Sequence, residues 1–174
     1  MGFMFTGIII KNGNNLNDAD VLEVFDQQHS YPEDDVSLEK AISSSFEGTA
    51  IARVDDMLVL FGPEIGYSCS FEGNELTETD KKLEKLSIQG DVVSFVLNSV
   101  ASTYAWSLFS NGNRIRVKTI EGKKVLFESD EESKYEKGMT MDEQGVIKLI
   151  ENFTGYSFIE LVFEKKISAA VYNY

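Results

Sequence analysis

The sequence contains few of the residues that cross-link or metallate a small fold. Its 174 residues include one cysteine, Cys69, and one histidine, His29. A single cysteine excludes an internal disulfide and a multi-cysteine zinc site, and a single histidine removes the usual nitrogen ligands. The sequence therefore predicts no metal and no cofactor, and its stability has to come from a packed core.

Long apolar runs are also missing. The longest one near the start, Met4–Ile10, is interrupted by Thr6 and Gly7 and is much shorter than the roughly 20 residues that cross a bilayer as a helix. No basic residue precedes it, which makes it a poor signal peptide. We therefore expect no membrane contact and a cytoplasmic location, with Met4–Ile10 as a buried strand.

Positive charge is scarce. Sixteen Lys and Arg residues face 29 Asp and Glu residues, which gives a formal net charge of -13. Such an acidic molecule repels polyanions, so we expect no nucleic-acid partner. Neither a glycine-rich phosphate loop nor a nucleophile motif is present, and we single out no catalytic residue.

The hydrophobic pattern predicts one α+β domain over residues 1–174 with a mainly antiparallel sheet. Two apolar runs flank Asp55 and Asp56 and predict a hairpin near residues 49–61. Four further runs with short connections predict a meander over residues 91–128. A last strand over residues 167–174 can return to this sheet.

Capping patterns locate about three to four helices. Asn17 begins one that we expect to end near His29, and a short one is expected at residues 36–45. Capping boxes predict two more, one opened by Thr77 with Asp80, the other by Thr140 with Glu143 and closed by Gly155.

Cations gather in one stretch, residues 110–124. With Asn111 and Gly112 as the centre of a type I′ turn, Trp106 faces Val117 on the buried side of the hairpin. The opposite side then carries three cations in a row, each across from one residue of the preceding strand: Arg114 from Phe109, Arg116 from Ser107, and Lys118 from Ala105.

The charges of this stretch are balanced nearby. Residues 114–124 carry five cations and one glutamate, whereas residues 128–136 carry five acids and one lysine. Three interpretations remain open: a solvated sheet face whose charges compensate each other, contact with a protein partner or a second copy, or an anionic ligand.

The N-terminal region is the most acidic. Residues 1–47 hold nine acidic residues against two lysines, a local charge of -7, and such a surface steers basic partners. The leading hypothesis is a non-catalytic binding module for a protein partner, in particular a basic one; inhibitors of toxic nucleases have this general composition. The candidate partner contacts are Asp18, Asp20, Glu23, Asp26, Glu33, Asp34, Asp35, Arg114, Arg116 and Lys118.

Two alternatives belong to other functional classes. A small hydrolase would use a pair of carboxylates, or Cys69 with His29 as its base. However, Cys69 has no basic neighbour in sequence, which favours a buried, inert thiol. A homodimer would associate through the sheet face or through residues 167–174.

Overall fold

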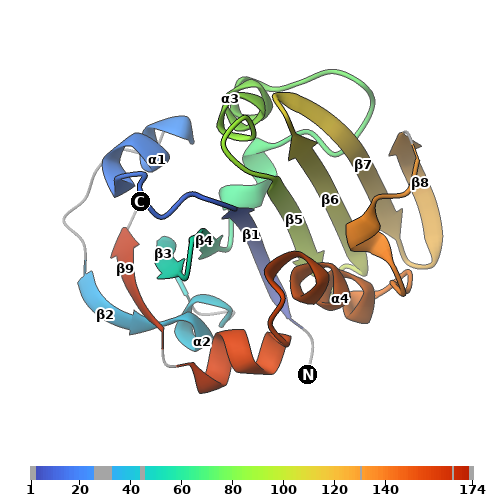
Figure 1. Cartoon of the computed structure of the whole chain (residues 1–174). Helices are drawn as coiled ribbons and strands as arrows, with labels where there is room; N and C mark the ends of the chain where they lie inside the picture. Colours follow the sequence, from blue (N-terminus) through green and yellow to red (C-terminus); the bar gives the residue numbers. More distant parts are fainter. Residues whose placement is uncertain (1–2, 26–32, 44–45, 130, 166, 173–174) are drawn as a thin grey trace.

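The structure is a computed structural model that describes residues 3–25, 33–43, 46–129, 131–165 and 167–172. Its centre is one nine-stranded sheet in the order β2-β9-β3-β4-β1-β5-β6-β7-β8, with each neighbouring pair antiparallel (Figure 1). The strands are β1 (Met4–Ile10), β2 (Glu33–Ser37), β3 (Thr49–Val54), β4 (Met57–Gly62), β5 (Val92–Asn98), β6 (Thr103–Ser110), β7 (Asn113–Glu121), β8 (Lys124–Ser129) and β9 (Ser168–Tyr172).

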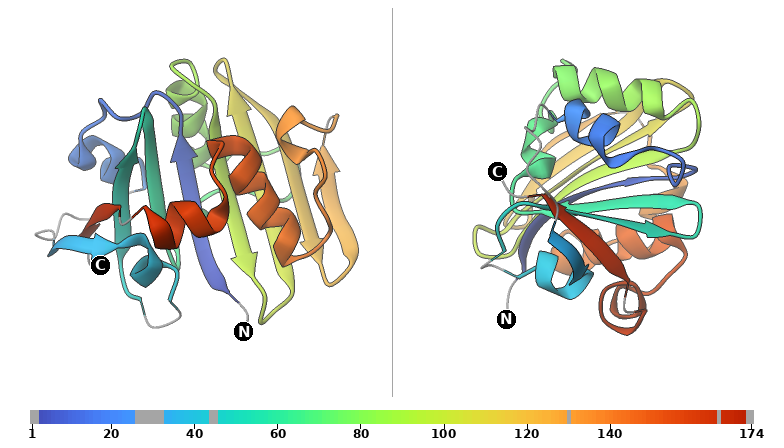
Figure 2. Two further views of the ribbon diagram at one scale, coloured as in Figure 1. Left: turned by 60° about the horizontal axis from the view of Figure 1, so that its bottom comes forward. Right: turned by 90° about the vertical axis from the view of Figure 1, so that its left-hand side faces the viewer.

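Helices cover both faces of this sheet (Figure 2). One face carries α2 (Leu38–Ala41), α4 (Glu143–Thr154) and the π-helical turn η3 (Glu160–Glu164); the other carries α1 (Asp18–Val24), α3 (Glu78–Leu86) and the 3₁₀ turn η1 (Ile65–Ser68). A further 3₁₀ turn, η2 (Lys134–Glu136), precedes α4. None of the helices in the described ranges has the length and apolar composition that a bilayer-spanning helix needs.

The central strand β1 requires a glycine where phenylalanine rings cross it. A Cβ atom on Gly7 would lie 2.4 Å from Cζ of Phe95 and 2.8 Å from Cδ1 of Phe61. These two rings pack edge to face with centroids 6.0 Å apart, and Phe5 lies 5.3 Å from Phe61. Because Gly7 has no side chain, this aromatic cluster can close over the middle of the sheet.

The predicted α+β class and its strands are confirmed. β3 and β4 form the hairpin, with Asp55 at φ 54° in its turn, and β5 to β8 form the meander. The first strand, Met4–Ile10, is almost entirely buried, and the last strand, β9, joins the sheet between β2 and β3. Since both its neighbours already hydrogen-bond to it, β9 offers no free edge to a second copy.

Helix ends are predicted less well. α1 ends at Val24, and His29 lies outside the described residues. The expected helix at residues 36–45 shortens to α2, because residues 33–37 form strand β2 instead. The capping box of Thr77 and Asp80 is confirmed.

The predicted capping box of Thr140 and Glu143 at the start of the last helix is wrong. Asp142 caps α4 by accepting from the backbone N–H of Gly145, and the hydroxyl of Thr140 donates to Asp142 instead of capping the helix itself. Gly155 ends α4 with φ 80°, as predicted.

The predicted register of the β6–β7 hairpin is wrong beyond its turn. Phe109 pairs with Arg114 as expected, but Leu108 pairs with Arg116, so Ile115 is the extra residue of a β-bulge. A shift of one residue moves all later side chains to the other face. Arg116 and Lys118 therefore lie on the α4 face with Trp106, opposite the face that carries Arg114, and the predicted row of three cations does not form.

Candidate functional site

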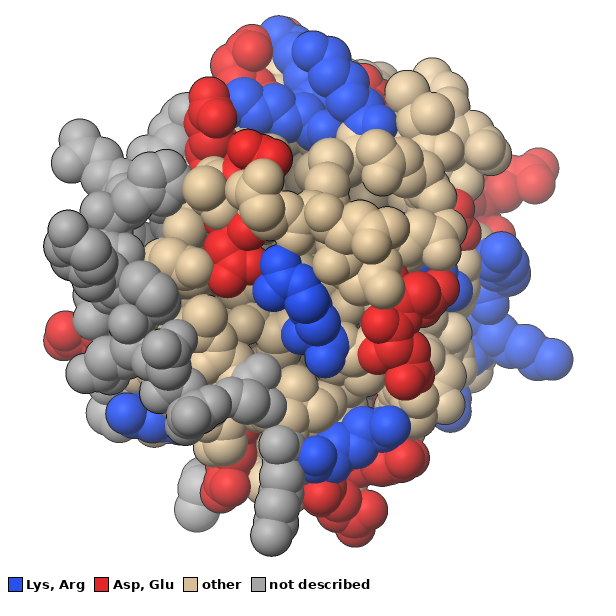
Figure 3. Space-filling model, turned by 60° about the vertical axis from the view of Figure 1, so that its left-hand side comes forward, with Lys and Arg blue, Asp and Glu red and all other residues tan. Residues whose placement is uncertain are grey.

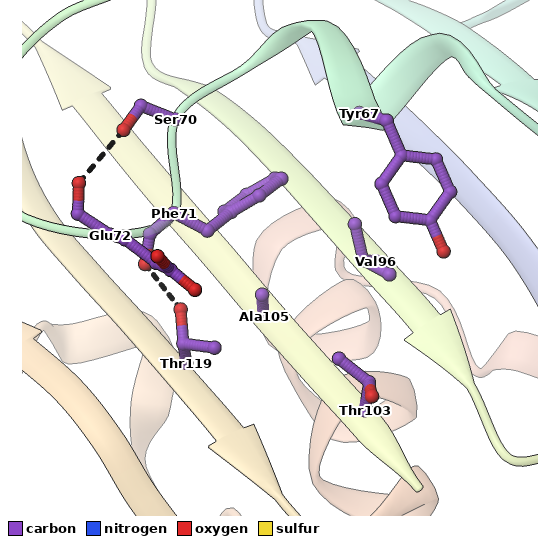
Figure 4. Close-up of a pocket in the computed structure, with 8 residues that line it drawn as sticks. All are labelled: Tyr67, Ser70, Phe71, Glu72, Val96, Thr103, Ala105 and Thr119. Carbon is purple, nitrogen blue, oxygen red and sulfur yellow. Dashed lines mark hydrogen bonds between the residues drawn. The ribbon is translucent and has the colours of Figure 1, made fainter. Parts of the chain in front are cut away.

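A pocket of about 350 Å³ lies on the α3 face of the sheet, where the loop after η1 crosses the strands. Figure 4 shows the rings of Tyr67 and Phe71 facing the strands that carry Val96 and Ala105. Tyr67 is 55% exposed, although aromatic side chains usually bury most of their area. The lining residues are Tyr67, Ser70, Phe71, Glu72, Val96, Thr103, Ala105 and Thr119.

Small side chains on three strands form the floor. Val96 pairs with Ala105, and Ala105 pairs with Thr119, so these three residues make one row across β5, β6 and β7. A row of small residues leaves a hollow where larger side chains would fill the space against the loop. Further along the same face, Leu83 of α3 and Phe109 of β6 fill the corresponding space.

A buried carboxylate of α3 fixes the loop that forms one wall of the pocket. Asp80 is fully buried, and its Oδ2 accepts hydrogen bonds from the backbone N–H of Ser70 at 3.0 Å and of Thr77 at 2.9 Å. Thr77 Oγ1 in turn donates to the carbonyl of Ser68 at 3.0 Å. The first turn of α3 therefore holds both ends of the loop.

Strands β6 and β7 hold the same loop from the sheet side. Arg114 donates to the carbonyls of Ser70 at 3.4 Å and Gly73 at 3.0 Å, and its Nη1 lies 3.9 Å from Asp80 Oδ2. Ser107 Oγ also donates to the Ser70 carbonyl, and Thr119 Oγ1 donates to that of Phe71. These contacts fix the position of the Phe71 backbone relative to the pocket floor.

Negative charge borders the pocket. Glu72 lines it and is exposed. Glu121 is also exposed and pairs with Thr103, which places it on the pocket face of β7, one row beyond Thr119. None of the eight lining residues is Lys or Arg, so the pocket combines apolar walls with an acidic border.

Two of the acidic residues predicted to contact a partner, Asp18 and Glu23, lie beside basic residues of this protein. Asp18 pairs with Arg53 at 2.6 Å and accepts from Tyr172 at 2.8 Å. Lys82 approaches α1 and donates to the carbonyl of Glu23 at 3.0 Å. Figure 3 accordingly shows acidic and basic side chains interleaved on the side of the molecule that carries α1 and β9.

The other acidic residues predicted to contact a partner lie on α1, on β2 or outside the described residues. Asp20 is exposed in the first turn of α1, beside the capping residue Asn17. Glu33, Asp34 and Asp35 belong to β2, whereas Asp26 lies outside the described residues.

The predicted exposure of Arg116 is wrong, because its side chain is 3% exposed. Its Nε lies 3.1 Å from both carboxylate oxygens of Glu136, which is 2% exposed, and its Nη1 donates to the Ser129 carbonyl at 2.6 Å. Trp106 Nε1 donates to Glu136 as well, at 3.0 Å. Arg116 is therefore part of the core of the protein.

Lys118 stays near the surface but is paired. Its Nζ lies 3.2 Å from Glu128, and hydrogen bonds from Lys118 and Arg116 lower the pKa of that carboxyl. The Lys118 ammonium also lies 5.9 Å from the centroid of the Trp106 ring.

The geometry around Cys69 is unfavourable to nucleophilic catalysis. The thiol is buried, as predicted, and burial together with Asp80 raises its pKa to about 12. The thiolate, which is the nucleophile, is then almost absent at neutral pH. Among the described residues, no group of three or more His, Cys, Asp and Glu side chains can hold a metal ion.

A second polar cluster joins Lys11, Asp91 and Tyr135. Tyr135 donates to Asp91 at 2.6 Å, and burial together with this carboxylate raises the pKa of the phenol. Burial lowers the pKa of Lys11, whose Nζ lies 4.8 Å from the ring centroids of Tyr135 and Phe153. The raised pKa keeps the phenol protonated at neutral pH. The contacts of this cluster join the end of β1, the start of β5 and η2.

The pocket itself was missed by sequence reasoning. The sequence offered one indication of the pocket. Its two rings, Tyr67 and Phe71, flank Cys69 within a segment rich in glycine and serine, which is typical of a loop that carries exposed aromatic residues. The row of Val96, Ala105 and Thr119 gave no signal, because those residues are distant in sequence.

No family model, no curated protein and no solved structure matches this chain.

Proposed function

We propose that the chain is a non-catalytic binding module that recognises a protein partner through the pocket under Tyr67 and Phe71. The observation that carries this proposal is a hollow between the exposed ring of Tyr67 and the partly buried ring of Phe71, whose loop is already fixed by Asp80, Arg114 and Thr119. A preorganised pocket avoids the entropic cost of ordering a loop on binding, and buried aromatic contacts dominate many interfaces.

The charge of the molecule favours a basic partner. A formal net charge of -13 accelerates the approach of cationic proteins, and added salt reduces this acceleration. A partner bound in this way should associate more slowly at high ionic strength, whereas its dissociation rate should change less.

A photo-crosslinking amino acid tests the proposal. Placed at Tyr67, it should form a covalent adduct with one protein of the source cell, and placed at Ile159 it should not. Ile159 is a matched control because it is 61% exposed and precedes η3, beyond the opposite face of the sheet.

A second variant distinguishes specific binding from chance capture. Thr103→Trp, at a partly exposed position in the lining, should fill the pocket and abolish the adduct at position 67. Adducts of equal yield at both positions, or an adduct that survives Thr103→Trp, would disprove recognition through the pocket.

A further inference from the structure

The hydroxyl groups that line the pocket are oriented by their backbone contacts. Ser70 Oγ is 3.0 Å from the carbonyl of Glu72, Thr103 Oγ1 is 3.4 Å from that of Ala101, and Thr119 Oγ1 contacts that of Phe71. A carbonyl oxygen has no hydrogen, so in each pair the hydroxyl is the donor. Each of the three hydroxyls therefore has only acceptor lone pairs left for a ligand.

The carboxylates extend this pattern. The carboxylates of Glu72 in the lining and of Glu121, which pairs with the lining residue Thr103, are also acceptors only. Apart from the exposed Tyr67 hydroxyl, the polar side chains that line the pocket thus offer a ligand acceptors, because their own hydroxyl donors are used by backbone carbonyls. An apolar anchor would remove water from these acceptors without replacing its hydrogen bonds, and a carboxylate ligand would be repelled.

We propose that the pocket binds an arginine side chain presented by a basic protein partner, an inference that rests on the proposed function. Guanidinium has five N–H donors and no acceptor, which complements the hydroxyls and Glu72. Its planar face stacks on aromatic rings such as Tyr67 and Phe71, while its aliphatic stem packs on apolar floor residues such as Val96.

A phage-displayed random peptide library selects ligands without knowledge of the partner. Selection on the wild-type protein, with counter-selection on Thr103→Trp, should enrich peptides that share one arginine. Replacing that arginine by citrulline keeps the shape but removes the charge, and it should weaken binding about tenfold.

Matched carboxylate variants then locate the charge that is recognised. Glu72→Gln should weaken the arginine peptide several-fold and leave the citrulline peptide unchanged. Glu75→Gln should change neither, because Glu75 is an exposed carboxylate of the same loop that does not line the pocket. Both sites are exposed, so thermal unfolding should show that both variants fold.

The outcomes separate this inference from the proposed function. Equal affinity for arginine and citrulline peptides, or enrichment of peptides with apolar anchors and no arginine, would overturn the arginine inference and leave the pocket as a binding site. If selection without the counter-selection step yielded only peptides that bind Thr103→Trp as well as wild type, the proposed function would fail too.

Discussion

Charged side chains are buried in the interior of this protein, and Arg116 is the clearest case. Its guanidinium is buried against Glu136, whereas Glu128, which it also contacts, is 49% exposed. Removing one member of a buried pair leaves an uncompensated charge in a medium of low polarity, but removing an exposed partner leaves water to replace it. The two glutamates should therefore differ in their contribution to stability.

Glu136→Gln should lower the free energy of unfolding by about 3–5 kcal/mol, and Glu128→Gln by about 1 kcal/mol or less. Urea unfolding at neutral pH measures both. Equal losses would mean that Arg116 reaches water in solution.

Cys69 should be unreactive in the folded protein. Its burial and its raised pKa, about 12, leave almost no accessible thiolate at pH 8. A chromogenic disulfide reagent should label it only after denaturation. Val100→Cys in a Cys69→Ala background is the positive control, because Val100 is 81% exposed, and labelling of native Cys69 at a comparable rate would contradict the structure.

At the scale of elements, the bulge at Ile115 determines which face of β7 meets which helix layer. If Ile115 instead paired with Leu108 in a regular register, Arg116 would leave Glu136 and lie on the α3 face. Val117, which is buried on that face, would move to the α4 face. The bulge therefore decides the composition of both cores near this edge of the sheet.

Deletion of Ile115 should remove the extra residue but keep Arg116 opposite Leu108 and beside Glu136, so it should cost about 3 kcal/mol or less. Ile115→Ala keeps the bulge and truncates a side chain that is 40% exposed, so its cost should stay near 1 kcal/mol or below. Thermal unfolding of the two variants tests this, and a deletion variant that does not fold would contradict the expectation that Arg116 keeps its place against Glu136.

For the molecule as a whole, net charge opposes compactness. With a formal charge of -13, mutual repulsion destabilises the folded state, and salt screens it. Raising NaCl from about 10 to about 200 mM, which shortens the screening length to less than about 10 Å, should increase the melting temperature by a few degrees.

A charge variant provides the control for the salt effect. Glu131→Lys with Glu132→Lys, at two exposed positions, changes the formal charge from -13 to -9 and should reduce the salt response. A melting temperature that falls with salt in the wild type would show that local ion pairs such as Arg53–Asp18 outweigh the overall repulsion.

The sequence by itself determined the α+β class, the strands other than β2, the Asn111–Gly112 turn and the capping box of Thr77 and Asp80, because these depend on hydrophobic periodicity and on contacts between residues close in the chain. The tertiary structure decided the bulge and the pocket. Arg116 is paired by a carboxylate twenty residues further along. The pocket forms where Phe71 crosses Ala105 and Thr119, through contacts between segments that local patterns cannot relate.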